Sequence, residues 1–216
     1  MKGMRIDVWS DFVCPFCYIG KTILDDALRE LPEQEKVEVH YRSYQLDPDA
    51  TYDPEKSFTE TFSELKQIPV EQVKQMNAQI AARAKEVGLN YNFADMKYSN
   101  TFDSHRLLQY AKTEGKEEEL TERLFYAYFT ESRLLSDHET LLQLAEEVGL
   151  DRDKVKQVLS SDQYKEEVLS DIGLAYQIGV RGVPYFVFNN KYAVSGAQPK
   201  EVFVEVLQKV LAEEEN

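Results

Sequence analysis

The two cysteines of the chain lie in one tetrapeptide, Cys14-Pro15-Phe16-Cys17. Random placement would give two cysteines this spacing in roughly 1% of chains of this length, so the pair suggests a shared task. A zinc site needs about four ligands, whereas the chain has no second cysteine pair and only the scattered histidines His40, His105 and His138. Two unrelated core thiols are the remaining alternative. The spacing therefore favours a redox-active dithiol, and no metal site is expected.

The dithiol is expected at the beginning of a helix. Pro15 suits the first turn, where its missing N–H needs no partner, and apolar residues recur at helical spacing from Ile19 to Leu31. Unpaired N–H groups and the helix dipole favour an anion at this end, so we expect the pKa of the Cys14 thiol to fall from about 8.5 into the range of about 3.5–7.5. Cys14 is then the predicted exposed nucleophile. Cys17, one turn further and on the inner side, is the predicted resolving cysteine.

The elements that hold this helix follow from the hydrophobic pattern. Short alternating stretches predict strands, and apolar residues at intervals of three and four predict helices. Strands are expected over residues 4–9, 37–45, 185–188 and 191–194, and helices over 16–31, 59–66, 70–87, 102–113, 117–130, 137–148, 151–160, 163–178 and 200–212. The order is strand, helix, strand, a block of helices, helix, strand, strand and helix. We therefore expect an α/β fold whose strands flank a long helical segment.

Composition and charge exclude several classes of protein. With 25 Lys and Arg against 39 Asp and Glu, the chain has a formal charge of −14, which argues against binding to nucleic acid or to an anionic membrane. Two cysteines in 216 residues exclude a disulfide-stapled scaffold. The sequence has neither a stretch of about 18 apolar residues, as a transmembrane helix requires, nor the apolar run of a signal peptide near its start. The cytoplasm is therefore the expected compartment.

Four stretches of the sequence resemble the DsbA-like family of the thioredoxin fold. They are residues 10–20 (SDFVCPFCYIG), 100–106 (NTFDSHR), 179–186 (GVRGVPYF) and 195–199 (SGAQP). Within this family the chain is most similar to the FrnE-like branch, which is related to 2-hydroxychromene-2-carboxylate isomerases and kappa-class glutathione transferases. The resemblance implies a thioredoxin fold with a large all-helical insertion. Residues 1–50 and 160–216 would form the thioredoxin-fold domain, and residues 51–159 the insertion.

The resemblance also implies roles for residues around the dithiol. Pro184 would be a cis-proline that faces the dithiol, and the backbone of Val183 would pair with an extended substrate. A trans proline at the start of a strand is the alternative. Further substrate-binding residues implied in this way are Pro15, Phe16, His105 and Gln198. The alternative for Phe16 is that it only packs against the insertion. The alternative for His105 is that it is an ordinary hydrogen-bonded histidine of a helix.

Asp7 is unusual in a strand that is expected at the centre of the sheet. DsbA-like proteins carry a buried acid on this strand beneath the dithiol, which implies that Asp7 has a raised pKa and accepts the proton of Cys17. A paired or solvated strand aspartate is the alternative. DsbA dithiols often have a histidine between the cysteines, whereas Pro15 and Phe16 are neutral. The direction of electron flow is therefore not predicted.

Three functions are compatible with these features. The first is a thiol-disulfide oxidoreductase that acts on disulfide- or thiol-containing proteins or small molecules. It would need no cofactor beyond its own dithiol, and an external thiol reductant or oxidant, such as glutathione or another low-molecular-weight thiol, would recycle it. The second is a glutathione-dependent isomerase or transferase of the kappa type, but those relatives usually carry serine at the position of Cys14. The third is a non-catalytic binding module. Either a monomer or a homodimer is compatible with the sequence.

Overall fold

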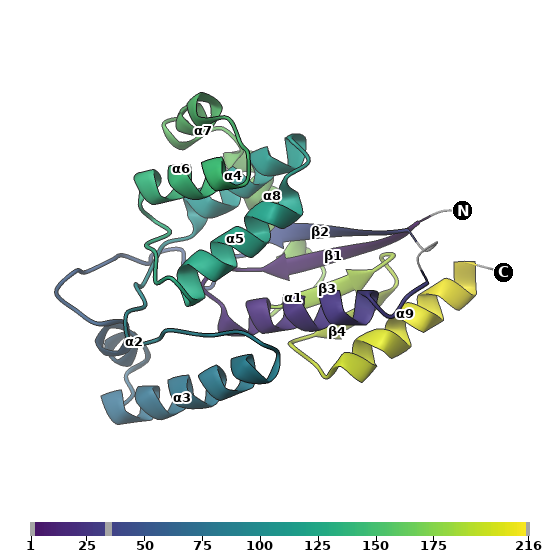
Figure 1. Ribbon diagram of the computed structural model, residues 1–216, viewed down its shortest axis with the longest axis horizontal. Helices are drawn as coiled ribbons and strands as arrows, with labels where there is room; N and C mark the ends of the chain where they lie inside the picture. The colour runs from purple at the N-terminus through teal and green to yellow at the C-terminus, as the bar shows by residue number, and fades with distance from the viewer. Residues whose placement is uncertain (1–2, 33–35, 215–216) are drawn as a thin grey trace. The chain divides into compact units, whose positions relative to one another are not determined.

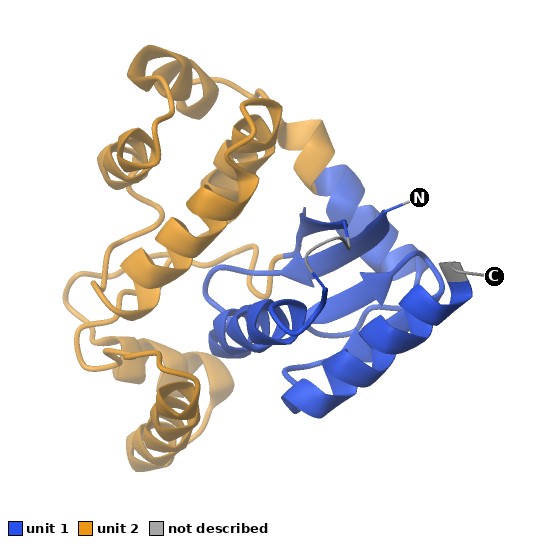
Figure 2. Cartoon of the chain, turned by 45° about the vertical axis from the view of Figure 1, so that its right-hand side comes forward, with its two compact units in different colours: residues 1–44, 169–216 blue, residues 45–168 orange. Residues whose placement is uncertain are grey.

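The computed structural model describes residues 3–32 and 36–214, which form two compact units (Figure 1). One unit is Met1–Tyr44 with Leu169–Asn216, and the other is Gln45–Val168 (Figure 2). The sequence prediction placed the boundaries after residues 50 and 159, and the units instead divide after residues 44 and 168. The second division falls inside the continuous helix α8 (Lys165–Gln177), so no loop marks it in the sequence.

The first unit contains a four-stranded mixed sheet with the order β2-β1-β3-β4. Its strands are β1 (Met4–Ser10), β2 (Val37–Ser43), β3 (Tyr185–Phe188) and β4 (Tyr192–Ser195). β1 pairs in parallel with β2, whereas the β1–β3 and β3–β4 pairs are antiparallel. The predicted α/β architecture is confirmed. The sheet combines the parallel strands β1 and β2, which a helix connects, with the antiparallel strands β3 and β4, which a tight turn connects.

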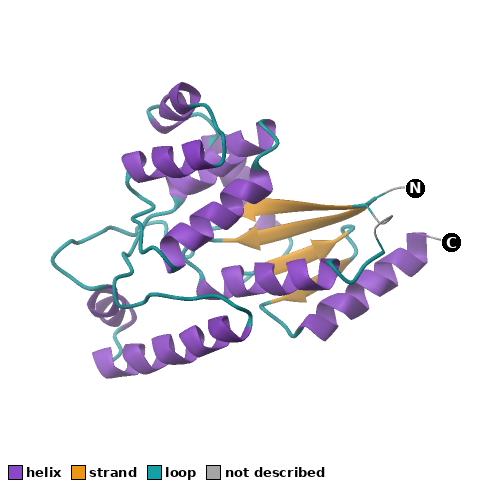
Figure 3. Ribbon diagram, viewed as in Figure 1, coloured by secondary structure: helices purple, strands orange, loops and turns teal. Residues whose placement is uncertain are grey.

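Helices α1 (Pro15–Leu28) and α9 (Lys200–Glu214) cover one face of this sheet (Figure 3). Phe186 on β3 lies opposite Val8 on β1, and its ring packs edge-on against Phe203 of α9 at a centroid distance of 4.9 Å. Side chains alternate between the faces of a strand, so Ile6 and Val8 point towards α1 and α9. The predicted extension of α1 to residue 31 is wrong, because tight turns end the helix after Leu28.

The opposite face of the sheet is covered by the part of α8 that belongs to this unit. The indole N–H of Trp9 donates a hydrogen bond of 2.9 Å to the backbone carbonyl of Asp171 on α8. Trp9 packs with Tyr44, Ala175 and Val180 in a buried cluster. Because Trp9 and Asp7 are two residues apart on β1, both side chains point to this α8 face.

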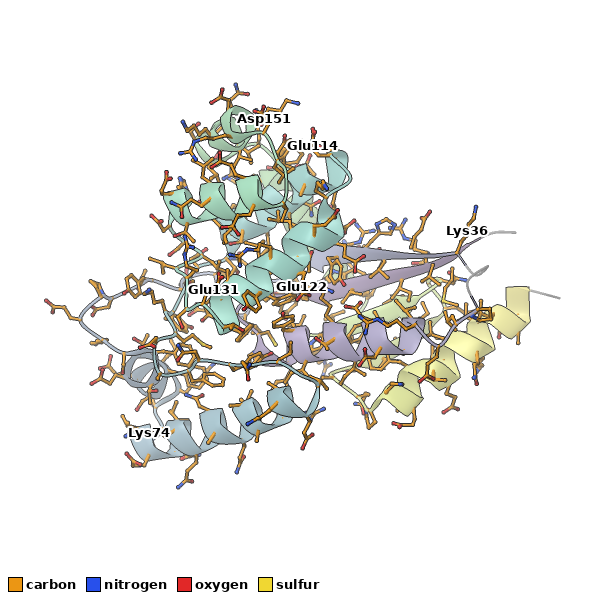
Figure 4. All side chains as sticks on the ribbon, viewed as in Figure 1. Lys36, Lys74, Glu114, Glu122, Glu131 and Asp151 are labelled. Atoms are coloured by element: carbon orange, nitrogen blue, oxygen red, sulfur yellow. The ribbon has the colours of Figure 1, made fainter. Side chains whose placement is uncertain are left out.

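The second unit, whose residues are all described, consists of helices joined by loops and contains no strand. Its helices are α2 (Phe58–Lys66), α3 (Val70–Glu86), α4 (Phe102–Thr113), α5 (Glu117–Phe129), α6 (His138–Glu147), α7 (Arg152–Leu159) and the first turn of α8. The buried side chains include Leu107, Leu124, Phe125, Tyr128, Phe129, Leu141 and Leu144. The unit also carries exposed acids such as Glu114, Glu131 and Asp151 (Figure 4).

A buried arginine ties α4 to the end of α7 in the second unit. Arg106 is 4% exposed and donates hydrogen bonds to the backbone carbonyls of Val158, Ser161 and Gln163. It also pairs with Asp103 at 2.8 Å. The last carbonyls of a helix have no partner within the helix, so the guanidinium of Arg106 supplies donors that α7 needs at its end.

No helix in the described part of the chain has the length and the hydropathy that crossing a membrane would require. Within residues 3–32 and 36–214, no three potential metal-ligating side chains come together.

Candidate active site

Cys14 and Cys17 lie at the beginning of α1, where the hydrophobic pattern placed them. Cys14 is the N-cap residue, with an extended backbone, and Pro15 is the first helical residue. The N–H of Cys14 donates to the carbonyl of Asp11 at 3.0 Å, and the N–H of Cys17 donates to the carbonyl of Cys14 at 3.0 Å. Both cysteines are free thiols. The backbone therefore turns sharply at the dithiol and brings both cysteines into the first turn of the helix.

The exposure predicted for Cys14 is wrong. Cys14 is only 4% exposed and Cys17 is 2% exposed. The Cys14 thiol instead contacts the backbone carbonyl of Val183, with a distance of 3.6 Å from Sγ to the oxygen. The carbonyl thus accepts the thiol hydrogen, which the sequence pattern could not show.

The environment of Cys17 strongly favours its neutral thiol. Burial is the largest cause that raises its pKa well above the ordinary value, and the hydrogen bond with Cys14 and the charge of Cys14 raise it further. A backbone hydrogen bond from Asp11 acts in the opposite direction, while the charge of Asp11 raises the pKa again. Cys17 therefore needs a proton acceptor before it can act as a nucleophile at neutral pH.

The loop that carries Pro184 packs directly on α1. The Val183–Pro184 peptide bond is cis, the geometry that the resemblance implied. A Cβ atom at Gly20 of α1 would lie 3.0 Å from Cγ of Pro184 and 3.1 Å from Cζ of Phe186. Because Gly20 has no side chain, α1 approaches this loop closely and Cys14 reaches the carbonyl of Val183.

Asp7 does not lie beneath the dithiol, and this part of the sequence prediction is wrong. Phe186 packs against α9 and lies close to Gly20 of α1, so the face that Phe186 shares with Val8 is the α1 face. Asp7 is the neighbour of Val8 on β1 and points to the other face. The strand itself therefore separates the carboxylate of Asp7 from Cys17.

The buried carboxylate of Asp7 belongs to a partly buried ion-pair network on the α8 face. Arg5 donates to it at 2.8 and 2.9 Å, and Arg42 donates at 2.8 Å. Arg42 also donates to one carboxylate oxygen of Asp171 at 2.9 Å. The other oxygen of Asp171 accepts from the backbone N–H of Ser43 at 3.0 Å. Burial by itself raises the pKa of Asp7, but the hydrogen bonds and charges of Arg5 and Arg42 outweigh it, so the pKa lies below its ordinary value. The predicted raised pKa is therefore also wrong.

The other predicted substrate-binding residues differ in their surroundings. Pro15 is half-buried, and Phe16 is 36% exposed beside the dithiol in the sequence. Gln198 is exposed, but its side-chain amide donates to the carbonyl of Ser195 at 2.9 Å and so closes the turn after β4. His105 belongs to the second unit, where it is 1% exposed on α4. The structure groups only Pro15 and Phe16 with the dithiol, together with Val183 and Pro184.

Asp11 is the residue at this site that the sequence prediction missed. It is fully buried, at 0% exposure, its carbonyl accepts from the N–H of Cys14, and both its backbone and its charge act on Cys17. Its place three residues before Cys14, inside the matched stretch 10–20, was the signal that could have identified it.

Comparisons with known proteins agree with this geometry. Residues 5–208 match the family described as DSBA-like thioredoxin domain. The chain is 28% identical over 208 residues to the uncharacterized protein YwbO of Bacillus subtilis (strain 168), covering 93% of this chain and 94% of YwbO. The crystal structure of SCO1869, a probable DsbA oxidoreductase from Streptomyces coelicolor, superimposes with a TM-score of 0.90 at 37% identity and covers 97% of this chain and 91% of its own.

A further solved structure shares the fold alone. It is a 2-hydroxychromene-2-carboxylate isomerase, which superimposes with a TM-score of 0.70 at 16% identity and covers 98% of this chain and 97% of its own.

Proposed function

Because the chain belongs to the family of DSBA-like thioredoxin domains, we propose that it is a thiol-disulfide oxidoreductase with Cys14 as nucleophile and Cys17 as resolving cysteine. One observation carries this proposal. Two free thiols share the first turn of α1, one at the N-cap and the other in a buried position one turn further. This is the arrangement in which one sulfur attacks a substrate and the other releases it.

The proposed reaction begins when the Cys14 thiolate attacks one sulfur of a substrate disulfide. A Cys14–substrate disulfide forms, and the other substrate sulfur leaves as a thiolate that takes up a proton. Cys17 then loses its proton and attacks Sγ of Cys14. The Cys14–Cys17 disulfide forms, and the second substrate sulfur leaves with the electron pair. The substrate gains two electrons and the dithiol loses two, and the reverse sequence oxidises a substrate dithiol.

The substrates and the recycling partner are part of this proposal. We propose disulfide- or thiol-containing proteins or small molecules as substrates. Since the whole chain has two cysteines, no third cysteine can pass electrons within it, and an external thiol or disulfide must restore the dithiol. Glutathione or another low-molecular-weight thiol fits this role. We also propose a cytoplasmic location and either a monomeric or a homodimeric state.

Reduction of insulin by dithiothreitol tests the proposed activity. The wild-type protein should accelerate the precipitation of insulin, and Cys14→Ser should not. Cys17→Ser should keep the first step and accumulate a disulfide between Cys14 and the substrate, which a non-reducing gel detects. A wild-type protein no better than Cys14→Ser in this assay would refute the proposal.

The alternative is a glutathione-dependent isomerase or transferase, and the fold shared with 2-hydroxychromene-2-carboxylate isomerase is the observation in its favour. Calorimetry on the protein with both thiols blocked distinguishes the two functions. Tight binding of glutathione to the blocked protein would favour the alternative. Loss of all glutathione binding on blocking would favour dithiol exchange, in which glutathione reacts with Cys14.

A further inference from the structure

The turn that follows β4 holds the loop of Pro184 by a backbone hydrogen bond. The N–H of Gly196 donates to the carbonyl of Pro184 at 2.8 Å. Gly196 has a φ of +82°, in the left-handed region that glycine adopts more readily than other residues. The preceding carbonyl of the loop, that of Val183, faces Sγ of Cys14 at 3.6 Å. The turn therefore fixes the chain one residue away from the carbonyl that contacts the nucleophile.

The side chain of Gln198 fixes the peptide group that makes this hydrogen bond. Its amide nitrogen donates to the carbonyl of Ser195 at 2.9 Å, and its backbone N–H donates to the carbonyl of Gly196 at 3.0 Å. The carbonyl of Ser195 and the N–H of Gly196 belong to one planar trans peptide group, in which they point in opposite directions. Gln198 thus holds one end of a rigid plane, and Pro184 accepts a hydrogen bond from the other end.

Apolar packing joins the same turn to α1. A Cβ atom at Gly20 would lie 3.6 Å from Cβ of Ala197 and 3.0 Å from Cγ of Pro184, and Ala197 is 8% exposed. The helix, the loop of Pro184 and the turn of residues 195–198 therefore meet at Gly20. Because α1 begins at the dithiol, this packing restricts movement of the loop relative to Cys14 while the turn is intact.

The contact that the turn fixes affects the ionisation of Cys14. A carbonyl accepts a hydrogen bond from a thiol but not from a thiolate, so it favours the neutral form. The thiolate is the form that attacks a disulfide. The carbonyl of Val183 therefore restrains the nucleophile when the loop holds it beside Sγ, and a loop that moves away would restrain it less.

We propose that Gln198 is a positioning residue for the first step of the reaction. Its amide holds the Ser195–Gly196 peptide group, and this group holds the loop of Pro184, whose preceding carbonyl faces Cys14. The resemblance implied that Gln198 contacts substrate, whereas the structure gives its amide nitrogen a partner within the turn. This inference rests on the proposed function and concerns the attack by Cys14.

A stopped-flow reaction of the reduced protein with excess 5,5′-dithiobis(2-nitrobenzoate) tests this inference. Attack by Cys14 releases the first coloured thiolate, because the surroundings of Cys17 favour its neutral thiol. Gln198→Met keeps a side chain of similar length and removes the amide donor. We expect its first phase at pH 7 to be about threefold faster than that of wild type, as for the loss of one weak hydrogen bond that favours the thiol.

The pH dependence of the first phase separates positioning from substrate contact. At about pH 10, above the ordinary pKa of a thiol, the gain of Gln198→Met should disappear, because the nucleophile is then ionised in both proteins. Loss of a substrate contact would instead slow the first phase at every pH. The titratable residues beside Cys14 are Cys17 and Asp11, and the substitution changes neither. A first phase that is unchanged at pH 7, or slower at every pH, would overturn the inference.

Gly196→Ala tests the same peptide group from its other end. Alanine is disfavoured at a positive φ, and its Cβ would meet only Nε2 of Gln198, at 3.9 Å, so the substitution acts through the backbone. It should also accelerate the first phase at pH 7. The double variant should be no faster than the faster single variant, because both substitutions release the same contact. Effects that multiply would show that the two residues act separately and would overturn the inference.

Gln208→Met and Gly88→Ala are the matched controls. Gln208 is an exposed glutamine on α9 of the same unit. Gly88 has a φ of +84°, and a Cβ atom there would meet nothing within 4 Å. Both variants should keep the wild-type rate at each pH. A gain in either control equal to that of Gln198→Met would contradict the inference. Far-UV circular dichroism verifies that each variant is folded.

A measurement on the unmodified protein keeps the inference testable if the variants do not fold. Hydrogen exchange followed by NMR should show the Gly196 amide exchanging at least about tenfold more slowly than in an unfolded peptide. Exchange at the rate of an unfolded peptide would overturn the inference. Failure of the proposed function looks different, because the wild-type protein would then act no better than Cys14→Ser on insulin, whereas the first phase requires only the thiol of Cys14.

Discussion

At the residue scale, two buried aspartates four positions apart have opposite environments. Asp7 is surrounded by the positive charges of Arg5 and Arg42, whereas Asp11 lies at the start of α1, where its backbone contacts both cysteines. A carboxylate between two guanidinium groups holds no proton at neutral pH and can only stabilise the fold. Two aspartates of similar burial thus differ in the groups that surround them.

The ion pairs of Asp7 make a stability prediction that depends on pH. Because the folded state lowers the pKa of Asp7, its contribution is present above the unfolded pKa of about 3.9 and is lost as the pH falls through the lower folded value. Asp7→Asn should therefore lower the free energy of unfolding by about 1–2 kcal/mol at pH 7, and by progressively less below about pH 4. Urea denaturation at a series of pH values measures both.

Asp26→Asn is the control for this prediction. Asp26 pairs with Arg29, but their side chains are 44% and 76% exposed, so the substitution should cost less than about 1 kcal/mol at any pH. An Asp7→Asn protein that behaves like Asp26→Asn would show that the network around Arg42 contributes nothing measurable.

The role of Asp7 could not be obtained from the sequence for a definite physical reason. Alternation along β1 shows that Asp7 and Val8 face opposite sides, but it does not say which side α1 covers. Arg42, the partner that helps to lower the pKa of Asp7, is 35 residues away in the chain. Only the parallel pairing of β1 with β2 brings the two strands side by side.

At the scale of the elements, the approach of α1 to the Pro184 loop depends on Gly20. Gly20→Ala would place a Cβ atom 3.0 Å from the ring of Pro184 and 3.1 Å from the ring of Phe186. We expect this overpacking to cost about 1–3 kcal/mol in the free energy of unfolding and to move Cys14 away from the carbonyl of Val183. Urea denaturation and the rate of the first reaction with 5,5′-dithiobis(2-nitrobenzoate) measure the two effects.

Gly173→Ala provides the matched comparison for Gly20→Ala. Gly173 also lies in a helix, α8, and a Cβ atom there would meet nothing within 4 Å. Alanine is the better helix former by about 1 kcal/mol, so Gly173→Ala should keep or increase stability. Equal effects at both glycines would contradict the close approach of α1 to Pro184.

The end of α7 gives a second prediction at this scale. Arg106→Lys keeps the charge but replaces a planar fork of donors by one ammonium group, which cannot serve three separate carbonyls and Asp103. We expect a loss of about 3 kcal/mol in the free energy of unfolding. Arg152→Lys should change stability by less than about 1 kcal/mol, since Arg152 forms its ion pairs at 39% exposure. Thermal denaturation followed by circular dichroism compares the two variants.

The helices and strands could be predicted from the sequence more readily than the contacts between them. The helix predicted over residues 102–113 is found as Phe102–Thr113, and the strand predicted over 185–188 is found as Tyr185–Phe188. Local periodicity determines such elements. The hydrogen bonds of Arg106 connect it to residues more than 50 positions away in the chain. Cys14 contacts Val183, which lies 169 positions away. Long-range contacts of this kind follow from the fold and not from local spacing.

At the scale of the whole molecule, the resemblance carried by four short stretches is confirmed. The DSBA-like family match extends over residues 5–208, and the structure of SCO1869 superimposes over 97% of the chain. The thioredoxin fold with its additional helices is therefore established. The sequence prediction succeeded here because motif order constrains a fold far more than any single motif does.

The net charge of −14 leads to a prediction about reaction rates. A negative protein attracts cationic reagents and repels anionic ones, and salt screens both effects. Reduced protein should therefore react faster with cystamine, a cationic disulfide, than with the anionic 3,3′-dithiodipropionate at low salt. In 1 M salt, where the screening length is about 3 Å, the ratio of the cystamine rate to the dithiodipropionate rate should fall. It should then approach the ratio that free dithiothreitol gives with the same two reagents. A ratio that does not depend on salt would contradict a role for the charge.

The hydrogen bond from Trp9 to α8 has a practical consequence. Trp9 is the single tryptophan of the sequence and is 3% exposed in the first unit, so its fluorescence reports on the sheet and on α8 alone. Circular dichroism, in contrast, records the helices of both units. Coincident unfolding curves from the two signals would identify one cooperative molecule. Separate curves would identify two units that lose their structure independently, and the native chain already carries the optical label needed to tell these cases apart.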